Sequence, residues 1–251
     1  MKQSFRTLGI EDEGFIVKDG IVIPRVADVL QLLVQGCLER NLLPTQFSTE
    51  LFAGQIEVKS VPCSNVDELF SQIKVLRNYL SDTAVGFGAS IMHVEFVPED
   101  ELGQLLVNPC NDRHLRLWQT LDYSVRVAAS QVASFQIHVG VTPDEAVRIL
   151  KYANESVVRD LLELGDNSEG KRLKAYTLVT HESGFHPSMS TISELYRHTY
   201  RNNFNPKDNW DWIRWKPSTH TLEFRMFGTH EDLSVLRSYV DAVLYLVSQA
   251  L

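Results

Sequence analysis

The chain has 251 residues and a formal net charge of −8 at neutral pH. Hydrophobic residues make up 44% and charged residues 22% of it, as in globular proteins with a substantial core. The negative charge argues against nucleic-acid binding, because phosphate contacts need clustered lysine and arginine. No apolar run approaches about 18 residues, the minimum for a membrane span. The N-terminus also lacks the apolar core of a signal peptide. We therefore expect a cytoplasmic protein.

In the first half of the chain, hairpins are expected to alternate with long helices. Strands are predicted at residues 8–17, 21–23, 47–58 and 84–96, and helices at 26–38 and from 65 to about 80. The first two strands should form a hairpin, because Asp19 and Gly20 between them are a favoured two-residue turn. Asn65, with Glu68 three residues later, fits a capping box at the start of the second helix.

The second half contains the sharpest helix signal of the chain. Thr142 is a predicted N-cap, Pro143 suits the first helical position and Glu145 the third, so a helix should run from there to about Leu164. Further helices are predicted at residues 112–121, near 192–200 and after 229, and extended segments at 124–141 and 212–226. Residues 165–209 are polar and poorly periodic, and we interpret them as a variable segment. This order predicts one α+β domain over residues 1–251, with helices on one side of a mostly antiparallel sheet.

Four segments far apart in the sequence alternate chemically functional side chains with apolar ones. Strand side chains alternate between the two faces of a sheet, so each segment offers one functional face and one core face. The functional groups are Glu11 and Glu13, then Gln55 and Glu57 after Glu50, then Gln136 and His138, and finally Glu223 and Arg225. Asp12 should point to the opposite face. In one sheet, the carboxylates would repel one another unless divalent cations neutralised them, and hard cations take oxygen ligands.

These segments occur in the same order in a known family. The chain resembles the carboxylate–amine ligases, that is, the type 2 glutamate–cysteine ligases and their relatives. Residues 8–13, 50–57, 136–141 and 210–225 carry the resemblance. It implies a glutamine synthetase-like fold, a curved antiparallel sheet whose concave face holds ATP and magnesium. It also implies that a carboxylate, such as that of glutamate, is joined to an amine through an acyl phosphate.

The resemblance assigns roles to individual residues. The implied metal ligands, for Mg²⁺ or for Mn²⁺ in its place, are Glu11, Glu13, Glu50, Glu57, His138 and Glu223. Arg225 and His138 are the implied catalytic residues, and Arg225 would contact phosphate or a developing oxyanion. The residues expected at the ATP cofactor are Arg214, Lys216, Gln136 and Gln55, of which Arg214 and Lys216 are the weaker candidates.

The sequence lacks the common nucleotide-binding motifs and leaves two other functions open. The chain has no P-loop motif, and Gly86-Phe87-Gly88 lacks the third glycine of a dinucleotide fingerprint. Residues 165–209 do not clearly reproduce the family segment that helps to form the substrate pocket, so the amino-acid substrate stays open. A non-catalytic nucleotide- or amino-acid-binding or regulatory member, or a metal-dependent hydrolase, are the alternatives. The expected partners are small-molecule carboxylate and amine substrates, and binding to nucleic acid or to a membrane is not expected. A homo-oligomer is compatible with the sequence.

Overall fold

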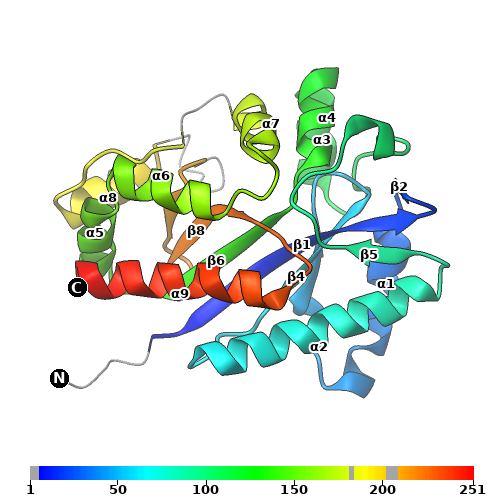
Figure 1. The fold of residues 1–251 in the computed structure, drawn as a ribbon, viewed down its shortest axis with the longest axis horizontal. Helices are drawn as coiled ribbons and strands as arrows, with labels where there is room; N and C mark the ends of the chain where they lie inside the picture. Colours follow the sequence, from blue (N-terminus) through cyan, green and yellow to red (C-terminus); the bar gives the residue numbers. More distant parts are fainter. Residues whose placement is uncertain (1–5, 181–183, 202–208) are drawn as a thin grey trace.

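The computed structural model describes residues 6–180, 184–201 and 209–251 and contains one eight-stranded sheet (Figure 1). The strand order is β3-β4-β1-β6-β8-β7, and β2 and β5 also pair with β1. All these pairs are antiparallel. The strands are β1 (Leu8–Lys18), β2 (Ile21–Val22), β3 (Phe47–Thr49), β4 (Gln55–Lys59), β5 (Ser90–Met92), β6 (Ser134–Gly140), β7 (Ile213–Lys216) and β8 (Thr221–Gly228).

Strand β1 is the centre of the sheet, because it pairs with β2, β4, β5 and β6. Its hairpin with β2 confirms the predicted turn: Asp19 and Gly20 both have positive φ angles, 52° and 80°. Such angles match the right-handed twist of the flanking strands. Asp12 points to the opposite face from Glu11 and Glu13, as expected, and is fully buried against Arg77.

The helices are α1 (Val26–Gly36), α2 (Val66–Val85), α3 (Asp112–Thr120), α4 (Tyr123–Gln131), α5 (Pro143–Tyr152), α6 (Glu155–Leu164), α7 (Lys171–Thr180), α8 (Ile192–Thr199) and α9 (Leu233–Ala250). Short 3₁₀ turns occur at Leu38–Arg40, Pro44–Gln46 and Glu99–Glu101. No helix in the described ranges has the length and apolarity needed to cross a membrane.

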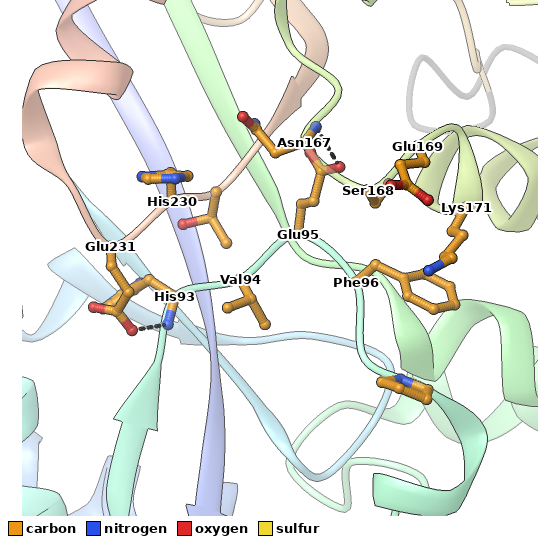
Figure 2. A pocket seen from close by; sticks show the side chains of 12 residues that line it. His93, Val94, Glu95, Phe96, Asn167, Ser168, Glu169, Lys171, His230 and Glu231 are labelled. Atoms are coloured by element: carbon orange, nitrogen blue, oxygen red, sulfur yellow. Dashed lines mark hydrogen bonds between the residues drawn. The ribbon is translucent and has the colours of Figure 1, made fainter.

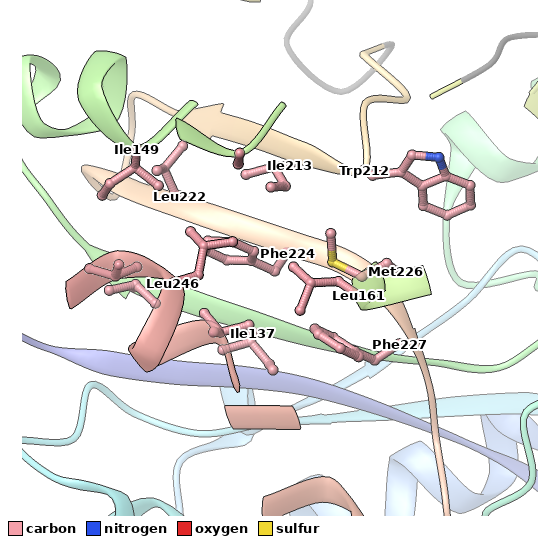
Figure 3. Close-up of a cluster of buried hydrophobic side chains, with 14 of the residues drawn as sticks. Ile137, Ile149, Leu161, Trp212, Ile213, Leu222, Phe224, Met226, Phe227 and Leu246 are labelled. Carbon is pink, nitrogen blue, oxygen red and sulfur yellow. The ribbon is translucent and has the colours of Figure 1, made fainter. Parts of the chain in front are cut away.

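Most of the helices cover the apolar face of the sheet. Figure 3 shows this core, in which Ile137 of β6 and Phe224 of β8 lie near Leu161 of α6 and Leu246 of α9. A second cluster joins β1 and β4 to α1 and α2. Helices α4 and α7 instead contribute residues to the lining of a cavity over the polar face of the sheet. The mostly antiparallel sheet with helices packed mainly on one face confirms the predicted α+β fold.

The prediction of an extended segment over residues 124–141 was wrong for its first half. Residues Tyr123–Gln131 form helix α4, and only Ser134–Gly140 is a strand. The alternation of Val125, Arg126 and Val127 resembles a strand pattern. However, Val125, Val127 and the following Ala128 are all buried in a helix that packs against α7. Tertiary contact therefore outweighs the modest helix disfavour of valine.

Other boundaries also differ from the prediction. The helix expected from Pro143 to Leu164 begins with the predicted capping box but is two helices, because Asn154 accepts hydrogen bonds from the backbone N–H groups of Ser156 and Val157 and starts α6. The strand expected over 84–96 is reduced to β5, since α2 continues to Val85. The extended region 47–58 is a β3–β4 hairpin, and helix α7 was not predicted.

Candidate active site

The predicted functional side chains lie on one face of the sheet and form two groups. Cross-strand pairing places Glu13 opposite Glu57 and His138 opposite Glu223. The two groups are Glu11, His138 and Glu223, and Glu13, Glu50 and Glu57. Within each group, one ligand atom per residue lies within 4.8 Å of the others. The sequence predicted the shared face, whereas the division into two groups comes from the register of the strands.

A cavity of about 460 Å³ opens over this face. Its lining includes Glu11, all three carboxylates of the second group, and Arg225. His138 lines an adjoining cavity of about 260 Å³, and Glu11 borders both cavities. Glu223 is fully buried at the base of the site. The site therefore consists of two adjoining cavities, with acidic residues along the sheet face beneath them.

In the first group the carboxylates are paired with cations. Glu223 accepts two hydrogen bonds from Arg214, at 2.7 and 3.0 Å, and Lys216 Nζ lies 3.4 Å away. Burial alone would raise the pKa of Glu223, but Arg214 and Arg225 lower it to about 2. Burial would also raise the pKa of Glu11, yet His138 at 3.4 Å and Lys216 at 3.3 Å hold it well below its usual range. Both carboxylates are ionised at neutral pH.

The second group has an excess of carboxylates. Burial raises the pKa of Glu13 to about 8, and the nearby charge of Glu57 adds to this shift. Burial and the charge of Glu13 raise the pKa of Glu50 to about 8. Lys59 Nζ lies 2.7 Å from Glu57 Oε1, but it is one cation among three acids. Carboxylates that retain their protons for want of nearby positive charge fit a divalent cation such as Mg²⁺ or Mn²⁺.

This excess predicts how the stability of the metal-free protein depends on pH. Between the ordinary carboxyl pKa of 4.5 and about 8, the folded protein retains protons on Glu13 and Glu50 that the unfolded chain releases. The free energy of unfolding should therefore fall as pH rises through this window, and the raised pKa of Glu57 acts in the same direction. Glu50→Gln should reduce the loss. Melting temperatures in chelator at about pH 6 and about pH 9 measure it, and an equal loss in wild type and variant would contradict this account.

Arg225 presents unused hydrogen-bond donors in the site. Its Nε and Nη1 atoms are buried and make no hydrogen bond within the described structure. Burial would lower the pKa of Arg225, but Tyr176 and the carboxylate of Glu223 raise it above its usual range. The guanidinium carbon lies 5.3 Å from the centre of the Trp210 ring. The Trp210 ring thus stabilises the permanently charged guanidinium of Arg225, whose unused donors lie beside the carboxylates of the site.

The residues predicted to bind the cofactor make protein contacts in this structure. Gln136 Nε2 donates to Glu13 Oε1 at 3.1 Å, and Gln55 Nε2 donates to the carbonyl of Val132. Arg214 is the bidentate partner of Glu223. These two glutamines and Arg214 all line the larger cavity, as does Lys216. Their contact with ATP stays a prediction.

Three further residues at the site were not identified from the sequence. Lys59 continues the alternation of β4 two residues after Glu57, so the strand pattern could have identified it. Tyr176 of α7 and Trp210 also line the larger cavity. Trp210 lies in the segment 210–225 that carries the family resemblance, but no role was assigned to it. Tyr176 lies in the segment interpreted as variable, and no local pattern marks it, because only the folded chain brings it over the sheet.

Comparison with known proteins places the chain in a family. The profile of glutamate-cysteine ligase family 2 (GCS2) matches residues 7–161, which is more than half of the chain. The chain belongs to glutamate-cysteine ligase family 2. The matched region includes Glu11, Glu13, Glu50, Glu57 and His138, whereas Glu223 and Arg225 lie outside it. No curated protein matches the sequence.

Solved structures show the same fold at low sequence identity. The family member aligns with a bifunctional glutathione synthetase from Pasteurella multocida at 13% identity and a TM-score of 0.58, over 96% of this chain and 39% of that one. It aligns with a glutamate–cysteine ligase from Francisella tularensis, solved in complex with AMP, at 10% identity and a TM-score of 0.53, over 90% and 62%. The chain therefore spans less than two thirds of the length of either protein.

Proposed function

We propose that the chain is an ATP- and Mg²⁺-dependent ligase that joins a carboxylate, as of an amino acid such as glutamate, to an amine. Family membership supports the reaction class. The observation that carries the proposal is the pair of carboxylate groups beside Arg225 on one sheet face. The three carboxylates of the second group have raised pKa values, so their charge destabilises a metal-free fold, and a cationic ligand that needs them is the simplest reason for their presence.

The two groups are two candidate cation sites. Glu13, Glu50 and Glu57 have the oxygen donors and the surplus charge to hold a divalent cation, and Glu11, His138 and Glu223 could hold a second. When bound, Mg²⁺ neutralises phosphate oxygens and stabilises the charge that develops during phosphoryl transfer. Lys59 and Lys216 lie between the cavities and add positive charge toward the phosphates.

The proposed reaction has two steps. The substrate carboxylate attacks the γ-phosphorus of ATP, so that ADP leaves and an acyl phosphate forms. The amine then attacks the carbonyl carbon, phosphate leaves, and the amine loses a proton. Both steps would place negative charge on oxygens near Arg225, whose Nε–H and Nη1–H groups make no hydrogen bond within the described ranges and can donate to them. No covalent bond to the protein is required.

The test is product analysis with ATP, Mg²⁺ and panels of carboxylates and amines. We expect a new amide, ADP and phosphate in equal amounts. Hydroxylamine in place of the amine should give the hydroxamate, because it traps an acyl phosphate. Hydrolysis of a substrate without ATP would indicate a metal-dependent hydrolase instead. Binding of ATP without turnover on any pair would indicate a non-catalytic member.

Metal binding gives an independent prediction. Glu57→Gln preserves the shape of the side chain but removes a charge from the second group, so Mn²⁺ affinity should fall at least about tenfold while the fold survives. Calorimetric titration with Mn²⁺ measures this, and Glu155→Gln on the exposed surface of α6 is the matched control. Equal affinity in wild type and Glu57→Gln would remove Glu57 from the metal ligands.

A further inference from the structure

Arg225 is placed at an irregularity of the sheet. Phe135 of β6 pairs with Phe227 of β8, whereas Ile137 pairs with Phe224, so Arg225 and Met226 together lie opposite one residue. This is the geometry of a β-bulge, which redirects side chains at the point where it occurs. Met226 and the next residue, Phe227, are both buried in the core, while Arg225 lines the cavity.

A second arginine, Arg172 of α7, binds the backbone of this bulge. Its Nη1 donates to the carbonyl of Met226 at 2.9 Å. Its Nη2 donates to the carbonyls of Phe227 at 2.9 Å and Arg225 at 3.2 Å. Arg172 is only 1% exposed, and these acceptors are neutral carbonyls. A buried guanidinium that contacts three successive carbonyls holds their orientation, since a planar fork has little freedom once it is bonded.

The start of α7 is itself held by hydrogen bonds. Glu95 Oε1 accepts a hydrogen bond from the backbone N–H of Asn167 at 2.7 Å, as Figure 2 shows. The N–H of Arg172 donates to Ser168 Oγ at 3.0 Å. Glu95, Asn167 and Ser168 line a separate cavity of about 560 Å³. Glu95 thus holds the loop before α7, and the side chain of Arg172 extends from the first turn of α7 to β8.

We propose that Arg172 is a positioning residue that maintains the bulge and so keeps Arg225 on the cavity side of the sheet. A bulge leaves backbone groups outside the regular ladder, and three carbonyls around this one are bonded by Arg172. Without these donors, β8 would relax at the lowest cost in free energy by shifting toward regular pairing with β6. A one-residue shift turns a strand side chain to the other face of the sheet, which would remove Arg225 from the site. The catalytic consequence rests on the proposed ligase function, whereas the placement of Arg225 does not.

Placement can be tested without any reaction, because Trp210 lies beside Arg225. The emission of Trp210 is isolated by subtracting the spectrum of each protein's Trp210→Phe counterpart. We expect Arg172→Met to change this emission in the same direction as Arg225→Met. Lys171→Ala, which alters the exposed neighbour of Arg172 on the same helix, should leave it unchanged. Unchanged Trp210 emission in folded Arg172→Met would overturn the proposal.

Activity provides the second readout. Arg172→Met should lower kcat by about 10- to 100-fold with a smaller change in KM for ATP. Arg172→Lys retains the charge but not the planar fork, so it should show an intermediate effect on both readouts. It also keeps the test decisive if the methionine variant misfolds. A lower melting temperature with kcat and emission intact in Arg172→Lys would reduce Arg172 to a structural residue. If wild type forms no amide, the ligase proposal fails, but the emission still decides the role of Arg172.

Discussion

Replacing Arg225 with lysine should lower kcat by about 10²- to 10³-fold and change KM for ATP much less. Arg225 Nε lies 3.6 Å from Glu223 Oε1, and neither its Nε nor its Nη1 atom makes a hydrogen bond to a residue that the structure describes. Lysine keeps the charge but loses the planar arrangement of donors that suits phosphate and carboxylate oxygens. Interactions made mainly in the transition state affect kcat, whereas equal binding of ground and transition states affects KM.

The alternative is that Arg225 serves only as an ion partner of buried Glu223. Arg225→Lys would then lower the melting temperature and leave turnover per folded molecule unchanged. Steady-state kinetics and a thermal melt on the same preparation separate the two roles. Arg237→Lys is a suitable control, because Arg237 is partly exposed on α9 and pairs with Asp67 away from the site. Intact kcat in Arg225→Lys would remove Arg225 from the catalytic residues.

The largest loss of stability is expected on the other face of β1. Arg77 of α2 donates to both oxygens of Asp12, at 2.7 and 3.1 Å, and Thr229 Oγ1 donates to Asp12 Oδ1 at 2.7 Å. Asp12 is 0% and Arg77 is 7% exposed. Asp12→Ala leaves a buried guanidinium without its counter-charge, so the free energy of unfolding should fall by about 3–5 kcal/mol. Urea denaturation measures this loss.

Two further variants show whether the loss comes from the broken pair. Arg77→Met should be about as harmful as Asp12→Ala, and the double variant should lose less than the sum of the two, because no unpaired charge is left buried. Asp28→Ala removes the partner of Arg25 in an exposed pair, and its effect should be much smaller. Additive losses in the double variant would contradict a coupled buried pair.

Local sequence patterns were sufficient for features that depend on neighbours along the chain. Alternation placed Glu11 and Glu13 on one face and Asp12 on the other, because side-chain direction in a strand follows from the pleat alone. The Asp19-Gly20 turn and the capping box at Thr142 were likewise predictable, since their geometry is decided within a few residues. The shared polar face of β1, β4, β6 and β8 followed from the same alternation.

Only the tertiary structure decided which of these groups meet. Strand register separated the acidic side chains into two groups, and one of them is left with three carboxylates and an excess of negative charge. Packing against α7 made residues 123–131 helical despite their alternating valines. Arg172 contacts the bulge beside Arg225 from a position 53 residues away, and no local pattern encodes such a contact. Burial and long-range hydrogen bonding are properties of the folded chain, so the sequence determined the faces of the strands and the fold determined the site.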